Sequence, residues 1–113
     1  MITPLTAEAA DLIARRFRVL ADATRLRVLD RLREREEASV GELVDALGTS
    51  QQNVSKHLGV LAGEGFVARR KEGTSALYRI ADPSVFDLCE QVCSRIEAQL
   101  AQLGALLGSP ASR

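Results

Sequence analysis

Apolar side chains recur at helical spacing through the first third of the chain. Residues 6–21 predict a helix that begins at Thr6, because apolar positions there stand three or four apart. These positions are Ala9, Leu12, Ile13, Phe17 and Leu20. Residues 21–37 predict a second helix capped by Asp22, with Leu26, Leu29 and Leu32 on its buried side. The charged run 31–37 at its end is typical of a solvated helix face with i,i+4 ion pairs.

Two shorter helices follow, with a tight break between them. Ser39 begins the first, and Glu42 stands three positions later, which is the spacing of a capping box. Gly48 ends this helix, and Ser50 caps the next one, which runs through residues 51–65. Helix, glycine-containing turn and helix together predict a helix-turn-helix over residues 39–62.

The pattern then becomes extended. Residues 66–71 and 74–80 predict a β-hairpin whose turn contains Gly73, and residues 83–107 predict a last helix with Pro83 near its start. The whole chain, residues 1–113, therefore reads as one mainly helical α+β domain. It has five helices and a two-stranded β-hairpin wing over residues 66–80.

The second helix of the helix-turn-helix has two chemically different sides. Val54, Leu58 and Leu61 face inward at i, i+4 and i+7, while the opposite side carries polar residues and no acid. These polar residues are Gln51, Gln52, Ser55 and Lys56. Glutamine, lysine and serine side chains can read base edges in a DNA major groove. The alternative is an amphipathic helix whose polar side is merely solvated.

Charge is distributed unevenly along a chain of zero formal net charge. Such a balance argues against a protein that binds polyanions without selectivity. Residues 49–80 nevertheless carry a net charge of +3, and Arg69, Arg70 and Lys71 stand just before the predicted hairpin turn. A wing would meet the DNA backbone or the minor groove at this point.

Three motifs, LADATRLRVLDRL, SQQNVSKHL and RRKEG, together resemble the ArsR/SmtB family of winged helix-turn-helix repressors over residues 17–95. The resemblance implies a homodimer built on the first and last helices, which binds an inverted-repeat operator in double-stranded DNA and leaves it when an effector binds. It implies that Arg70 contacts DNA from the wing. It also implies that the groove is read by Ser50, Gln51, Gln52, Ser55 and Lys56. Lys71, beside Arg70, is a further candidate DNA contact.

The chain departs from the family's metal sites. Residues 42–45 hold no cysteine where thiolate sensors carry C-x-C, and the last helix keeps only Asp82 of the zinc ligands. Cys89 and Cys93 remain as candidate sensor thiols, which suit arsenite, another soft metal(loid) or an oxidant. The last helix has one apolar stripe, formed by Val85, Cys89, Val92, Ile96, Leu103 and Leu107. The alternative is that both cysteines simply pack as small apolar residues.

Other readings remain open. His57, the only histidine, falls at the core-facing edge of its helix, where a hydrogen-bonded structural role is expected. The fold could serve as a scaffold for protein binding, or as a constitutive DNA binder without an inducer. An enzyme is the weakest alternative, because no nucleophile–base pair or phosphate loop is present. Without a signal peptide or membrane-spanning stretch, the chain is expected to be cytoplasmic and to bind no membrane.

Overall fold

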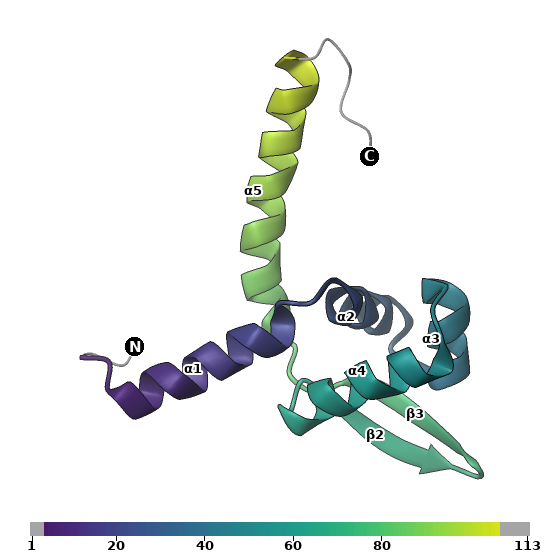
Figure 1. Cartoon of the computed structure of the whole chain (residues 1–113). Helices are drawn as coiled ribbons and strands as arrows, with labels where there is room; N and C mark the ends of the chain where they lie inside the picture. Colours follow the sequence, from purple (N-terminus) through teal and green to yellow (C-terminus); the bar gives the residue numbers. More distant parts are fainter. Residues whose placement is uncertain (1–3, 107–113) are drawn as a thin grey trace. The chain divides into compact units, whose positions relative to one another are not determined.

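The computed structural model describes residues 4–106, and Figure 1 shows the order of their helices and strands. The helices are α1 (Ala7–Leu20), α2 (Ala23–Arg35), α3 (Val40–Leu47), α4 (Gln51–Gly63) and α5 (Val85–Leu106). The strands are β1 (Glu37–Ser39), β2 (Val67–Glu72) and β3 (Ser75–Ile80). Rather than one body, the described residues form two compact units: an N-terminal unit that ends at Asp82 and a C-terminal unit that begins at Pro83.

The predicted caps fix where the first helices begin. The Thr6 hydroxyl accepts a hydrogen bond from the Ala9 N–H at 3.1 Å, and the Asp22 carboxylate accepts one from the Arg25 N–H at 3.0 Å. Of the predicted apolar face of α1, only Leu20 is buried. The other apolar side chains of this face are therefore available to a partner.

The core of the N-terminal unit is aliphatic. It lies among α2, α3 and α4, and its fully buried side chains are Val28, Leu29, Leu32, Leu43, Val54, Leu58 and Leu61. One core prediction is wrong, because Leu26 is 41% exposed and Val28 takes the buried position on α2. Truncating a fully buried leucine such as Leu58 to alanine costs about 2–5 kcal/mol of stability.

The sheet has three strands rather than the two of the predicted hairpin. Its order is β1-β3-β2, and both pairings are antiparallel. The extra strand arises where the charged run was predicted to stay helical. Glu36 has a φ of 69°, which ends α2 and turns the chain toward β3. Glu37 therefore belongs to the sheet, where it pairs with Arg79 of β3.

The wing itself forms as predicted. Strands β2 and β3 extend past the helices as a hairpin (Figure 1). Gly73 has a φ of 62° at the first of the two loop residues, the position where two-residue hairpin turns of type II′ take glycine.

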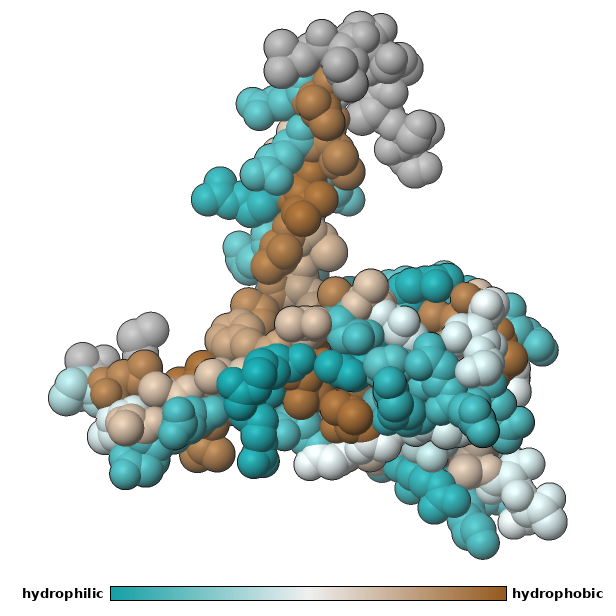
Figure 2. Space-filling view, in the orientation of Figure 1, coloured by the Kyte–Doolittle hydropathy of each residue, from teal (hydrophilic) through white to brown (hydrophobic). Residues whose placement is uncertain are grey.

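The C-terminal unit consists mainly of α5, which begins two residues after Pro83. Its predicted stripe is confirmed in part as an exposed apolar surface, visible as a brown band along the helix in Figure 2. Val92, Ile96 and Leu103 are exposed as predicted, whereas Val85 is buried and Cys89 is half-buried. The exposed members are Leu88, Val92, Ile96, Leu100 and Leu103, each between 40% and 55% exposed. Leu88 and Leu100 were not predicted, and Leu107 lies outside the described residues. Within residues 4–106 there is no helix whose length and hydropathy would let it span a membrane.

Candidate nucleic-acid interface

The helix-turn-helix is held by local hydrogen bonds around its turn. Ser39 and Glu42 form the predicted capping box at the start of α3, and Gly48 ends α3 in the left-handed conformation with a φ of 70°. The Ser50 hydroxyl then accepts the Asn53 N–H at 3.1 Å, while the Asn53 side chain donates to the Thr49 hydroxyl at 3.0 Å. These contacts set the direction in which α4 leaves the turn.

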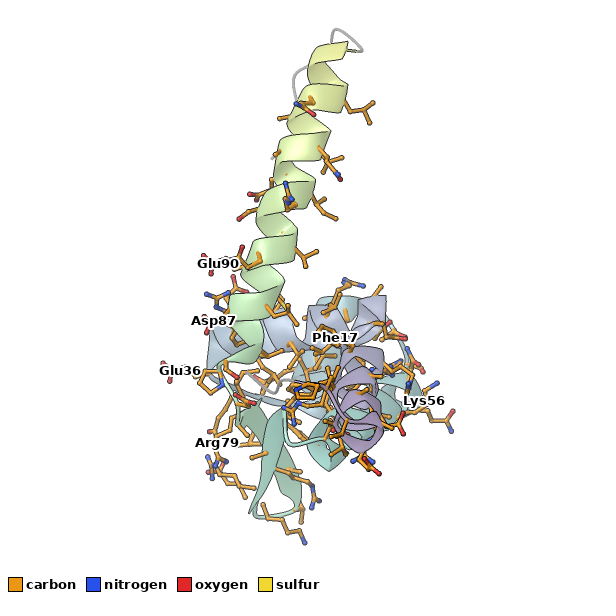
Figure 3. The ribbon with its side chains drawn as sticks, turned by 90° about the vertical axis from the view of Figure 1, so that its left-hand side faces the viewer. Phe17, Glu36, Lys56, Arg79, Asp87 and Glu90 are labelled. Atoms are coloured by element: carbon orange, nitrogen blue, oxygen red, sulfur yellow. The ribbon has the colours of Figure 1, made fainter. Side chains whose placement is uncertain are left out.

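Helix α4 buries one side and exposes the other. Its buried side chains are Val54, His57, Leu58 and Leu61, all 5% exposed or less. Every groove residue predicted here is exposed, and we call this set the α4 ridge: Ser50, Gln51, Gln52, Ser55 and Lys56. Figure 3 shows Lys56 directed outward from the helices. Because α4 contains no acidic residue, the ridge offers hydrogen-bonding groups without a charge that repels phosphate.

The three basic residues of the wing divide between its two faces. All three are exposed. Side chains alternate along a strand, so Arg69 and Lys71 share the face of buried Val67, whereas Arg70 lies on the opposite face. Among residues 4–106, no carboxylate lies within ion-pair distance of Arg69 or Lys71.

Arg70, the wing contact that the family resemblance implies, is already engaged. Its guanidinium donates to both carboxylate oxygens of Glu37, at 2.7 and 2.9 Å, and lies 3.4 Å from Glu72. This hydrogen bonding lowers the pKa of Glu37 and raises the pKa of Arg70. Sequence reasoning missed Glu37, because it placed this residue on a solvated helix.

His57 has the structural role expected of it. The residue is 5% exposed, and its Nδ1 lies 3.0 Å from a guanidinium nitrogen of Arg25. Arginine can only donate, so Nδ1 must accept and the ring proton must lie on Nε2. The carboxylate of Asp22 is 3.9 Å from the same nitrogen, beyond hydrogen-bond distance.

Arg25 joins three helices through one guanidinium. Besides His57 of α4, it donates to the backbone carbonyls of Arg18, at 3.3 Å, and Val19 near the end of α1. Its own backbone N–H is capped by Asp22 at the start of α2, which lowers the pKa of that carboxyl. The aspartate and arginine of the LADATR segment therefore hold the α4 ridge in a fixed orientation relative to α1.

A second group of contacts ties α1 to the far end of α4. The Arg16 guanidinium stacks 4.6 Å from the centre of the Phe66 ring and pairs with Asp82 at 3.2 Å. Arg15 pairs with Glu64, directly after α4, at 3.1 Å. Helix α1 thus contacts residues just after the end of α4 directly, and it is linked to the middle of α4 through Arg25 of α2.

The two cysteines lie on α5 in the C-terminal unit. Cys89 is half-buried and Cys93 is exposed. Within the part of the chain that the structure describes, no group of three or more histidine, cysteine, aspartate or glutamate side chains is placed to hold a metal ion. One chain contributes two thiols, so a tetrahedral thiolate site would need both cysteines of a second copy.

Comparison with known proteins identifies the same motifs. A family model for a helix-turn-helix domain matches residues 20–70. A probable mercury resistance operon repressor of Streptomyces lividans is 44% identical over 78 residues, which cover 69% of this chain and 62% of that repressor. The chain therefore matches less than two thirds of that relative's length.

Solved structures match over most of the chain. An antimony-specific transcriptional repressor, AntR, is 33% identical with a TM-score of 0.76, covering 87% of this chain and 88% of that one. A homodimeric winged helix-turn-helix DNA-binding domain from Mycobacterium bovis, a possible ArsR-family transcriptional regulator, is 31% identical with a TM-score of 0.72. That match covers 89% of this chain and 95% of the other.

Replacing Arg25 with lysine tests the junction of the three helices. Lysine keeps the charge but loses the fork that reaches separate acceptors, so Arg25→Lys should lower the free energy of unfolding by about 2–3 kcal/mol. Arg27→Lys is the matched control, because Arg27 makes a single 3.3 Å bond to the Leu47 carbonyl and should lose about 1 kcal/mol or less. Urea unfolding at fixed protein concentration measures both, and equal losses would contradict the assigned role.

Proposed function

Because this chain belongs to the ArsR/SmtB family of winged helix-turn-helix regulators, we propose that it represses transcription by binding an inverted-repeat operator as a homodimer. The observation that carries the proposal is the α4 ridge. Its polar side chains are exposed and free of acids, and aliphatic side chains buried beneath them fix their direction. A protein that acts on operator DNA in this way works in the cytoplasm.

The chemistry of the ridge supports sequence reading. Gln51 and Gln52 can pair with adenine through two hydrogen bonds, and Lys56 can reach the acceptors of guanine. Ser55 adapts to several base edges. Ser50, at the N-terminus of α4, stands beside backbone N–H groups that suit a phosphate. In the wing, Lys71 and Arg70 are the proposed backbone contacts, although Arg70 must first leave Glu37.

Two exposed apolar surfaces, one on α1 and one on α5, support the proposed dimer independently of each other. On α1, Leu12 and Phe17 are 59% and 52% exposed, and α5 carries its stripe of exposed aliphatic residues. Surfaces of this kind are stabilised when a second copy covers them. A dimer places two α4 ridges on the two half-sites of an operator.

The rival reading, a scaffold that binds proteins, has less support. A docking helix presents large apolar side chains, but Val60, at 37%, is the sole large apolar residue exposed on α4. Members of the family are regulators, so no enzymatic activity is proposed.

We assign the inducing signal to Cys89 and Cys93, as a soft metal(loid) such as arsenite or as thiol oxidation. Soft ions prefer thiolates, and thiols from two copies of α5 could share one site. Similar proteins include a probable mercury resistance operon repressor and an antimony-specific repressor. The alternative is a constitutive DNA binder whose cysteines only pack.

Operator binding is the first test. A duplex is selected from a random pool with the wild-type protein, and affinity for it is measured by fluorescence anisotropy. Gln52→Ala and Lys56→Ala should each lose about 1–3 kcal/mol of binding, because each removes a base contact. Arg33→Ala, which removes an exposed charge on α2, is the control and should lose little. Failure to enrich any duplex would refute the proposal that the chain is a repressor.

Association is tested on α5. Leu103→Glu puts a charge on the apolar stripe and should convert the dimer to a monomer in sedimentation velocity. Gln102→Glu adds the same charge at the neighbouring exposed position, off the stripe, and should stay dimeric. Leu12→Glu makes the corresponding test on α1. Unchanged sedimentation of Leu103→Glu and Leu12→Glu would reject these surfaces as the interface.

The signal is tested with arsenite and hydrogen peroxide as probes. Each is added to the wild-type complex with its selected duplex, and release is followed by anisotropy. Cys89→Ser combined with Cys93→Ser should abolish release while leaving DNA affinity unchanged. Release that persists in this variant would place the sensor elsewhere, and a wild-type protein that never releases DNA would support the constitutive alternative.

A further inference from the structure

The wing arginine is held across the sheet by an acid of the strand that sequence reasoning did not predict. Leu77 of β3 pairs with Ser39 on one side and with Arg70 on the other, so these residues share one face of the sheet. Glu37, two positions before Ser39, lies on the same face. Its carboxylate receives two hydrogen bonds from the Arg70 guanidinium, at 2.7 and 2.9 Å.

This ion pair is poorly placed to stabilise the fold. The side chains of Arg70 and Glu37 are 44% and 33% exposed, and pairs so open to water contribute little to folding. Its effect on charge is larger. Glu37 cancels Arg70 at the wing, and Glu72 adds a second carboxylate 3.4 Å away. Arg69 and Lys71 lie on the other face, where no carboxylate among residues 4–106 is near enough to cancel their charge.

Carboxylate and phosphate present the same acceptor geometry to a guanidinium, which both can bind through two parallel hydrogen bonds. A DNA phosphate can therefore take Arg70 only by displacing Glu37. Binding to DNA of arbitrary sequence depends almost entirely on the number of phosphates that basic groups neutralise. An internal competitor for one of those groups lowers generic binding.

We propose that Glu37 competes with DNA phosphate for the Arg70 guanidinium and so weakens the binding of the wing to generic duplex. The inference rests on the proposed function, and it assigns a role to a residue outside the α4 ridge.

The test uses a 40-base-pair duplex of mixed sequence and measures affinity by anisotropy over a range of potassium chloride concentrations. Glu37→Gln removes the charge and keeps the shape. It should steepen the slope of log affinity against log salt by about 0.9 for each protomer. At 0.1 M salt this corresponds to roughly fivefold to tenfold tighter generic binding per protomer. Glu37→Ala, which also removes the amide, should act in the same direction.

Two controls separate release of Arg70 from a general change in charge. Glu34→Gln removes the same charge from an exposed i,i+3 pair with Arg31 on α2, and should leave the slope unchanged. Glu37→Gln combined with Arg70→Ala should lose the increment. This variant also excludes release of Arg79, which pairs with Glu37 across the strands and helps to lower the Glu37 pKa.

Each result decides for or against the proposal. Unchanged slopes in both Glu37 variants, with cooperative thermal unfolding showing that they fold, would overturn it. So would an increment that survives Arg70→Ala, or one that Glu34→Gln reproduces. Failure of the proposed function looks different, because the wild-type protein would then bind neither the mixed duplex at low salt nor any selected duplex.

Discussion

The Arg25 guanidinium fixes the orientation of α4, the helix that carries the ridge, relative to α1 and α2. It meets His57 from α4 and two carbonyls from the end of α1, and its backbone N–H is held by Asp22 at the start of α2. A guanidinium is planar, so acceptors that bind it together cannot rotate independently. The buried imidazole is thereby satisfied, and the polar side of α4 is aimed away from the core. Any shift of α1 would reach α4 through this group.

The parts of the fold that depend on local pattern could be predicted from sequence. Ser39, Ser50 and Gly48 act within one helical turn, so the ends of α3 and α4 follow from neighbouring residues. The exposed side of α4 follows in the same way, because Val54 and Leu58 must be buried together. On α2, spacing alone could not distinguish Leu26 from Val28, since each fits an apolar helix face and only the packed neighbours select Val28.

Contacts between residues distant in sequence could not be predicted. Strand β1 has no β-branched residue, and it forms because Glu36 turns the chain and the edge of β3 offers backbone partners. The bonds from Arg25 to His57 and from Arg70 to Glu37 span 32 and 33 positions. Sequence reasoning singled out His57 and Arg70 but not their partners Arg25 and Glu37, because a charged side chain carries no local sign of its partner.

The α4 ridge and the wing differ in their acidic residues, and this difference explains how a chain of zero net charge can suit DNA. On α4 the acids are absent, so hydrogen-bonding groups reach base edges without repulsion. On the wing the acids are present, and Glu37 and Glu72 hold one of three neighbouring basic residues. Attraction to any phosphate is thus kept low while base reading is left intact. Selectivity in such a protein comes from shape and from hydrogen bonds to base edges, and contacts between charges contribute little to it.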